Sequence, residues 1–292
     1  MMRFLLSICM LLPIGAVAVA DEKILVTKQT SESFIVFEDW QGPPLRVWFH
    51  IPDNYHASTP IVFVMHGVGR DADRYYDEWQ ALAEQHSFVL LVPEFSKEDF
   101  PGAAGYNLGN MYQESGELND ESFWSFSAID SIFVRIKDQL GSQRSGYRIY
   151  GHSAGAQFVH RFILFKPTAK YELAITANAG WYTIPGFDVD FPYGLRKTPV
   201  NSEALVHALQ QPVMIMLGAL DNDPNHPSLR KTQQAQAQGL HRFERGHFFF
   251  KKAKDKAASL AAPFNWSLHI VPNAEHQNRQ MAQAAAAILA AD

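Results

Sequence analysis

Cysteine is almost absent from this sequence: of its 292 residues, only Cys9 is one. Cys9 lies in the apolar segment at the start of the chain, and if that segment is removed, no thiol remains. Disulfide bonds, a thiol nucleophile and a cysteine-ligated metal site are then excluded. We expect such a chain to be held together by its hydrophobic core alone, which suits an exported protein of a bacterial periplasm.

The chain also lacks an excess of positive charge. It has 25 Lys and Arg against 30 Asp and Glu, and its formal net charge of −5 is dispersed along the sequence. Proteins that bind nucleic acid neutralise phosphates with clustered basic residues, so nucleic acid is excluded as a partner. The same lack of a basic stripe gives no support for binding to anionic lipid. The composition does not bear on the oligomeric state.

Residues 1–20 read MMRFLLSICMLLPIGAVAVA and have the pattern of a secretory signal peptide. Arg3 supplies the positive start, an apolar stretch follows, and residues 18–20 form an A-x-A-like cleavage site. The alternative, an uncleaved membrane anchor, is disfavoured because the apolar stretch is shorter than the roughly 20 residues that span a bilayer. We therefore expect a mature chain of residues 21–292 with no stable membrane insertion, located in the periplasm or secreted.

From residue 33 onward, apolar β-rich runs alternate with segments of helical periodicity. Strands are expected at residues 33–40, 45–52, 60–67, 88–95, 146–151, 171–179, 213–219 and 265–271. Helices are expected at residues 71–86, 121–140, 153–166, 201–210, 227–238, 243–261 and 277–291. The pattern predicts a single α/β domain with a mostly parallel eight-stranded sheet and helices on both faces. Two long loops, residues 96–120 and 181–200, either carry binding function or decorate the surface.

A serine lies between two glycines in the run YGHSAGAQ, residues 150–157, where the strand pattern changes to a helical one. A serine hydroxyl is a poor nucleophile unless a base removes its proton and donors receive the oxyanion. A sharp strand-to-helix turn would expose the hydroxyl of Ser153 and direct amide groups toward a reacting carbonyl. Gly151 and Gly155 suit such a turn because strand and helix come close together there. Small residues at a corner also serve packing alone, so the motif needs partners.

Both required partners follow in the chain. Asp221 comes just after the apolar run of residues 213–219, and His276 follows the last predicted strand. The carboxyl ends of parallel strands lie along one edge of a sheet, so these side chains can meet Ser153. Asp223 is the alternative acid. Asp221, Asp223 and His226 could also suggest a metal site, but one short loop offers no distant ligand, and we interpret it as a solvated turn.

These motifs resemble those of the α/β-hydrolase superfamily across nearly the whole predicted mature chain. MHGVGRDADRYYDEWQALAEQHSFVLLVPEF (residues 65–95) together with GHSAGAQ (residues 151–157) is similar to the poly(3-hydroxybutyrate) depolymerase and feruloyl esterase-like branch. The resemblance implies an α/β-hydrolase fold and a catalytic triad on a nucleophile elbow. Secreted members of the branch often carry cysteines that the predicted mature chain lacks.

The resemblance, together with the chemistry, implies a role for each residue. Ser153 would attack an acyl carbonyl, His276 would move the proton, and Asp221 would hold the imidazole. The oxyanion would be bound by the backbone N–H of Ala154 and, in families with this H-G pattern, by that of Val68. No cofactor is implied, because these groups complete acyl transfer unaided.

Aromatic and imidazole side chains near the predicted strand ends are candidates for substrate binding. The candidates are Trp181, Tyr182, Tyr106, Trp124 and His152. Aromatic residues also fill hydrophobic cores, so for each of them the alternative is a packed core side chain.

The sequence therefore predicts a serine esterase that acts on a small-molecule or polymeric carboxylic ester. Acyl transfer to an alcohol or amine, or cleavage of a peptide bond, would use the same residues and stays open. A binding protein on a hydrolase scaffold is the alternative of a different class, and it is disfavoured because nucleophile, acid and base are all present in order.

Overall fold

The computed structural model describes residues 33–291. The predicted signal peptide, residues 1–20, lies outside these residues. Within the described range, no helix is both long and apolar enough to cross a membrane.

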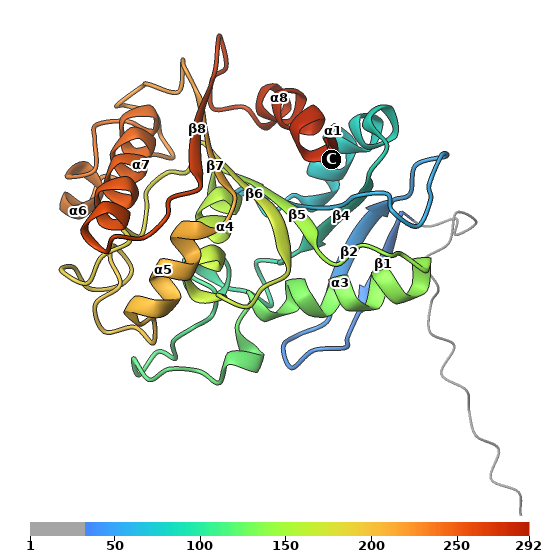
Figure 1. Ribbon diagram of the computed structural model, residues 1–292, viewed down its shortest axis with the longest axis horizontal. Coiled ribbons are helices and arrows are strands. Elements are labelled where there is room, and N and C mark those ends of the chain that lie inside the picture. Colours follow the sequence, from blue (N-terminus) through green and yellow to red (C-terminus); the bar gives the residue numbers. More distant parts are fainter. Residues whose placement is uncertain (1–32, 292) are drawn as a thin grey trace, which may run out of the picture.

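The described chain folds around one eight-stranded sheet with the order β1-β2-β4-β3-β5-β6-β7-β8 (Figure 1). Its strands are β1 (Phe34–Phe37), β2 (Leu45–His50), β3 (Ile61–Met65), β4 (Val89–Glu94), β5 (Tyr147–His152), β6 (Tyr171–Ala177), β7 (Val213–Gly218) and β8 (Trp266–Val271). The pairs β1–β2 and β2–β4 are antiparallel, and the other neighbours are parallel. The predicted mostly parallel eight-stranded sheet is confirmed, and its antiparallel pairs lie at the β1 edge.

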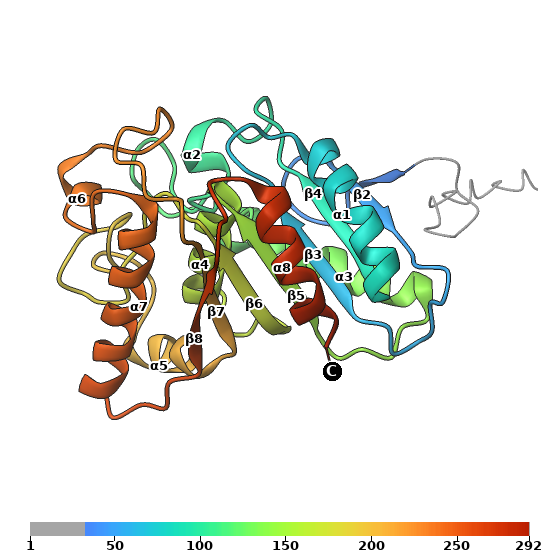
Figure 2. The same cartoon turned by 90° about the horizontal axis from the view of Figure 1, so that it is seen from above.

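Helices cover both faces of the sheet (Figures 1 and 2). They are α1 (Ala72–His86), α2 (Gly102–Gly105), the 3₁₀ turn η1 (Glu121–Phe123), α3 (Ser127–Leu140), α4 (Ala154–Phe165), α5 (Ser202–Gln210), α6 (Gln233–Gln236), α7 (Arg242–Ser259) and α8 (Asn278–Ala290). Helices α1 and α8 pack in one apolar cluster, and α3, α4, α5 and α7 contribute to the cluster on the opposite face. Two separate layers of core therefore sandwich the sheet.

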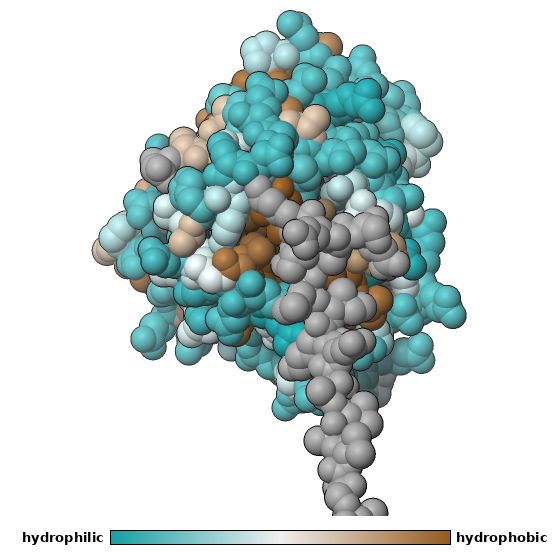
Figure 3. Space-filling model, turned by 90° about the vertical axis from the view of Figure 1, so that its right-hand side faces the viewer, coloured by the Kyte–Doolittle hydropathy of each residue, from teal (hydrophilic) through white to brown (hydrophobic). Residues whose placement is uncertain are grey.

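Strand burial follows each strand's place in the sheet. All five residues of β3, in the middle of the sheet, are buried, as its continuous apolar run predicts for a strand covered on both faces. The edge strand β1 alternates between buried Ile35 and Phe37 and exposed Val36. Seen from the β1 side, the visible described surface is mostly hydrophilic, and its hydrophobic groups gather near the middle of the view (Figure 3).

Two helix predictions need correction. The expected helix at residues 121–140 divides, because Trp124 takes an extended conformation between η1 and α3. The expected helix at residues 227–238 shrinks to α6, which begins only where the side chain of Thr232 accepts a hydrogen bond from the N–H of Ala235. The residues ahead of α6, 227–232, form turns and open loop instead.

The corner between β5 and α4 depends on two glycines. A Cβ on Gly151 would lie 2.2 Å from the carbonyl oxygen of Gly155, and a Cβ on Gly155 would lie 2.0 Å from that of Met65. Neither distance is possible for a side-chain carbon, so the helix can start against β3 and β5 only with glycine at both positions. Between them Ser153 has φ 57° and ψ −113°, a conformation that costs a non-glycine residue about 1–3 kcal/mol.

The corner predicts a large destabilisation for Gly155→Ala. The added carbon meets the backbone of β3, which cannot move aside cheaply, and we expect a loss of at least about 2 kcal/mol in the free energy of unfolding. Urea denaturation measures it. In the control variant Gly186→Ala, the nearest atom to the new carbon is Lys256 Cε at 3.6 Å, and the free energy should change by less than about 1 kcal/mol. Equal stability of the two variants would contradict this account of the corner.

Candidate active site

Ser153 lies at the carboxyl edge of the sheet, between the end of β5 and the start of α4. Its positive φ lifts the side chain out of both regular elements, and the hydroxyl borders two cavities. The first amides of a helix have no partner within the helix, so the N–H of Ala154, the first residue of α4, is available beside this hydroxyl.

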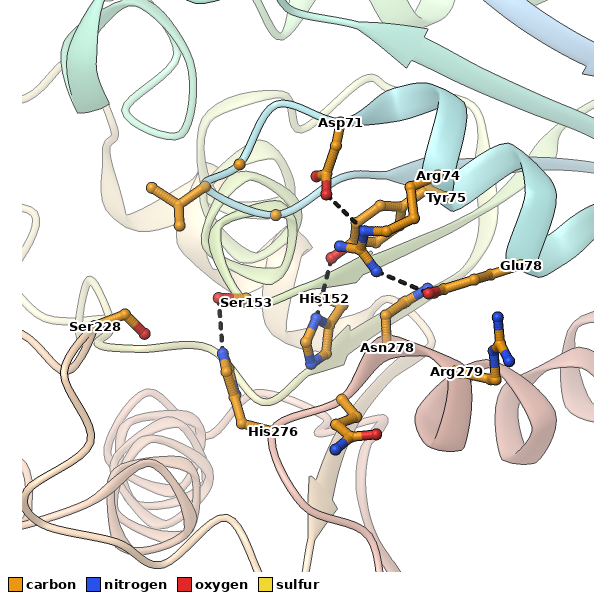
Figure 4. Close-up of a pocket in the computed structure, with 14 residues that line it drawn as sticks. Asp71, Arg74, Tyr75, Glu78, His152, Ser153, Ser228, His276, Asn278 and Arg279 are labelled. Atoms are coloured by element: carbon orange, nitrogen blue, oxygen red, sulfur yellow. Dashed lines mark hydrogen bonds and ion pairs between the residues drawn. The ribbon is translucent and has the colours of Figure 1, made fainter.

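Two more loops at the same edge complete a hydrogen-bonded chain, of which Figure 4 shows the contact between Ser153 and His276. His276, after β8, places its Nε2 3.0 Å from Ser153 Oγ. The Nδ1 of the same ring lies 2.7 Å from Oδ2 of Asp221, which follows β7. Residues separated by more than 50 positions in sequence are thus brought into direct contact. The arrangement can pass a proton from the hydroxyl to an imidazole whose other nitrogen is held by a carboxylate.

The two candidate acids have different environments. Asp221 is 4% exposed and contacts the imidazole, whereas Asp223 is exposed and accepts a hydrogen bond from the N–H of Asn225 in its own loop. The geometry therefore joins Asp221, and not Asp223, to His276. Among residues 33–291 no group of three or more His, Cys, Asp or Glu side chains could hold a metal ion.

Arg242 was not singled out from the sequence, yet it holds the second oxygen of the carboxylate. Its Nη1 lies 3.2 Å from Asp221 Oδ1, and its Nη2 donates to the hydroxyl of Ser228 at 2.8 Å. Both members of the ion pair are almost fully buried. Burial lowers the pKa of the Arg242 guanidinium, and the neighbouring charge of Asp221 opposes that shift. The carboxylate is therefore fixed between an imidazole and a guanidinium.

The loop after β3, which holds Val68, is positioned by a buried imidazole. The N–H of Phe95 donates to Nε2 of His66, so we assign the ring proton to Nδ1, which donates to the carbonyl oxygen of Gly67 at 3.1 Å. Tyr106 supports the same loop, since its hydroxyl donates to the carbonyl oxygen of His66 at 2.8 Å. Burial lowers the pKa of His66 to about 4, which keeps the ring neutral at pH 7.

Two cavities meet at Ser153. The first, of about 490 Å³, is shown in Figure 4, and the second has a volume of about 580 Å³. Val68, Ser153 and Ser228 border both. The side chains that line only the first include His276, His152, Arg74, Glu78, Asn278 and Arg279. Those that line only the second include Arg70, Lys97, Asn107, Gln157, Trp181 and Arg230.

The predicted substrate-binding residues divide between the cavities and the core. His152 lines the first cavity and Trp181 the second. Tyr106, Trp124 and Tyr182 line neither; they are at most 3% exposed and belong to the hydrophobic core. Tyr182, for example, stacks on Phe249 at 4.3 Å between ring centroids. For these three the alternative of a packed core side chain is the one that the structure shows, because their rings pack among the other side chains of that core.

Solved structures of known proteins share this architecture. Poly(aspartic acid) hydrolase-1 of Sphingomonas sp. KT-1 is 41% identical, with a TM-score of 0.86 over 88% of this chain and 97% of that one. The poly(3-hydroxybutyrate) depolymerase LpqC of Bordetella parapertussis is 31% identical, with a TM-score of 0.80 over 84% of this chain and 83% of that one.

This chain belongs to the α/β-hydrolase superfamily. Within it, the poly(3-hydroxybutyrate) depolymerase and feruloyl esterase-like branch that the sequence resembles is also confirmed. The fluorophosphonate-binding serine hydrolase F of Staphylococcus aureus is 15% identical, with a TM-score of 0.58 over 89% of this chain and 98% of that one, and shows the shared fold alone. No protein-family model and no curated protein matches the sequence. By its similarity to these hydrolases, the chain is a serine hydrolase, as predicted.

His152 of this α/β-hydrolase is a buried neighbour of the histidine that contacts Ser153. The two imidazole centroids are 4.8 Å apart, and the hydroxyl of Tyr75 lies 3.1 Å from His152 Nδ1. Burial lowers the pKa of His152 well below its usual range, and the charges of His276 and Arg242 act in the same direction. A neutral ring therefore lies beside His276.

The buried imidazole of His66 predicts an acid-sensitive fold. Its pKa is about 4 in the folded protein and about 6.5 in the unfolded chain. The unfolded state therefore binds more protons than the folded state between these two pH values. The contribution of His66 to the free energy of unfolding is accordingly full above pH 6.5 and is lost as the pH drops toward 4. His66 alone should account for a loss of about 3 kcal/mol over this interval. Urea denaturation at pH 7, 5.5 and 4 measures the loss.

The variant His66→Gln isolates this contribution. A glutamine keeps one donor and one acceptor without titrating, so the stability should fall less steeply with pH than in the unmodified protein. His207→Gln, an exposed substitution on α5, serves as the matched control and should keep the original slope. If His66→Gln has the original slope as well, the buried neutral imidazole does not contribute to acid sensitivity.

Proposed function

We propose that this α/β-hydrolase cleaves carboxylic esters through an acyl-enzyme on Ser153. One observation carries the proposal: Ser153 Oγ, both ring nitrogens of His276 and the carboxylate of Asp221 form one continuous hydrogen-bonded chain beside two cavities. Each group stands where the chemistry needs it. The serine faces the substrate, the imidazole accepts its proton, and the carboxylate stabilises the imidazolium.

The first half of the reaction forms the acyl-enzyme. Ser153 Oγ attacks the ester carbonyl while its proton moves to His276 Nε2. The carbonyl oxygen becomes an oxyanion, and we assign its binding to the N–H groups of Ala154 and Val68. His276 then gives the proton to the oxygen of the leaving alcohol, the bond between carbon and that oxygen breaks, and the acyl group stays on Ser153.

The second half releases the acid. A water molecule takes the place of the alcohol, His276 removes its proton, and the hydroxide attacks the acyl carbonyl. The second tetrahedral intermediate collapses when His276 returns the proton to Ser153 Oγ. No cofactor is needed for either half, since every proton transfer passes through the same imidazole.

The names of the two similar hydrolases point to polymeric substrates. One acts on poly(aspartic acid), whose units are joined by amides, and the other on poly(3-hydroxybutyrate), whose units are joined by esters. Serine acyl transfer cleaves both bond types. We therefore propose a polymeric or oligomeric ester as the substrate, with an amide-linked polymer as the second candidate because the relative with 41% identity acts on one. Export to the periplasm or medium stays a prediction from residues 1–20.

The proposed nucleophile is tested by Ser153→Ala. The unmodified protein should hydrolyse 4-nitrophenyl butyrate and react covalently with a fluorophosphonate probe at Ser153, because the hydroxyl is activated by His276. The variant should lose the probe reaction and at least about 10⁴-fold in kcat. Ser228→Ala, which removes another hydroxyl at the same cavities, should still be labelled. An unmodified protein that neither turns over any ester nor takes the probe would refute the proposed function.

The proposed acid is tested by comparing Asp221→Asn with Asp223→Asn. Asparagine at position 221 cannot hold the imidazole in the productive tautomer or stabilise its cation, so kcat should fall by up to about 10⁴-fold. Asp223→Asn removes the same charge two residues away and should change kcat by less than about threefold. Steady-state rates on 4-nitrophenyl butyrate decide the matter, and a larger loss in Asp223→Asn would reverse the assignment.

A further inference from the structure

The second cavity is positively charged although the chain as a whole is negative. Arg70, Lys97, Arg230 and Arg242 line it, and no Asp or Glu does. The first cavity is mixed: Arg74 is paired with both Asp71 and Glu78, and Arg279 adds one further cation. Charge therefore differs sharply between the two sides of the same serine.

Within residues 33–291, three of the four cations of the second cavity have no acidic partner. The ion pairs found within residues 33–291 include Arg242 with Asp221 but none for Arg70, Lys97 or Arg230. Arg70 donates instead to four backbone carbonyl oxygens between the end of β4 and the start of α2. Neutral oxygens hold its guanidinium in place and leave its charge uncompensated.

The ring of Trp181, which lines the second cavity, contacts two guanidinium groups. The Cζ of Arg161 lies 4.2 Å from the ring centroid of Trp181, and the Cζ of Arg230 lies 4.7 Å from it. Arg161 is fully buried and bonds to Thr183 and to backbone carbonyl oxygens. Cation–π contact offsets part of the repulsion between two guanidinium groups, but an anion in the cavity would offset far more of it.

Arg230 is the most accessible of these guanidinium groups. Its Nε donates to the hydroxyl of Tyr193 at 2.7 Å, so the stem is oriented, while the residue as a whole is exposed. A guanidinium presents paired N–H donors that match the two oxygens of a carboxylate. Arg230 can therefore bind a carboxylate that enters the second cavity.

The position of His276 decides which part of the substrate occupies each cavity. Its Nε2 must reach the leaving group to protonate it, and His276 lines the first cavity but not the second. Ala154, whose N–H is assigned to the oxyanion, lines the second. The leaving group accordingly belongs in the first cavity and the acyl group in the second.

We propose that the substrate carries a carboxylate on its acyl side, bound in the second cavity by Arg230 with the support of Lys97 and Arg70. The inference rests on the proposed function of Ser153 and extends it, because it assigns the anion to one side of the scissile bond. The fixed cations select acyl groups that end in a carboxylate. The mixed first cavity does not impose the same requirement on the leaving group.

The test uses pairs of esters that differ only in one charge. On the acyl side, the mono-4-nitrophenyl esters of glutaric, adipic and suberic acid are compared with the same esters methylated at the far carboxyl. On the leaving-group side, 4-acetoxybenzoate is compared with its methyl ester. For at least one acyl chain length, kcat/KM should favour the free acid by about tenfold or more, whereas 4-acetoxybenzoate should show no preference above about twofold.

Variants connect the preference to the cavity. Arg230→Gln should reduce the acid-to-ester ratio of kcat/KM by about tenfold, mainly through KM of the acid, and Arg230→Lys should restore part of it. Lys231→Gln removes an exposed cation from the adjacent position outside both cavities and should keep the ratio. A tenfold preference found only for 4-acetoxybenzoate, or no preference on either side, would overturn the proposal.

A binding measurement separates this inference from the proposed function. Adipate should bind to the Ser153→Ala protein in calorimetric titration, and the double variant with Arg230→Gln should bind it at least about tenfold more weakly. Adipate binding that depends on Arg230 without any ester turnover would leave the carboxylate site standing and refute the esterase. Turnover of neutral esters with no adipate binding and no acid preference would retain the esterase and overturn the carboxylate site.

Discussion

The close approach of two backbones at the β5–α4 corner is the constraint on which the site depends. Gly155 lies against the carbonyl oxygen of Met65 with no room for a side-chain carbon, so α4 begins directly over β3 and β5. That contact fixes Ser153 in its positive-φ conformation and places the N–H of Ala154 beside the hydroxyl. The core packed on both faces of the sheet supplies the free energy that holds this strained residue.

A second constraint is that buried arginine side chains need hydrogen-bond partners that stabilise their positive charge. Arg242, Arg161 and Arg245 are nearly or fully buried, and only Arg242 has an acidic partner among the described residues. Backbone carbonyl oxygens accept hydrogen bonds where carboxylates would otherwise do so. Arg245, for example, donates to the carbonyl oxygens of Gly180, Arg230 and Gly239. Burial lowers the pKa of both Arg161 and Arg245, which is the cost of desolvating these cations. Neutral partners preserve a positive potential that a carboxylate partner would cancel.

Much of the fold could be predicted because its strands carry strong local patterns. The apolar run of β3 reflects its burial on two faces, and the glycines around Ser153 reflect the close approach of two backbones. Both requirements leave a recognisable pattern in the sequence. Trp181 and Tyr182 show what a local sequence pattern cannot predict. They are adjacent aromatic residues after the same strand, yet one lines a cavity and the other is packed in the core, because only tertiary packing decides which way each ring turns. Arg230 was missed for a different reason, since it lies in a loop where a helix was expected.

The backbone conformation at Ser153 also restricts which nucleophile the corner can hold. At φ 57° a β-branched residue is a genuine steric outlier, so threonine is disfavoured although it offers the same hydroxyl chemistry. Cysteine, with a single heavy atom on its Cβ, would fit the corner, but residues 33–291 contain none. The corner thus suits serine or cysteine as its nucleophile, and it disfavours threonine on stereochemical grounds and not because its hydroxyl reacts differently.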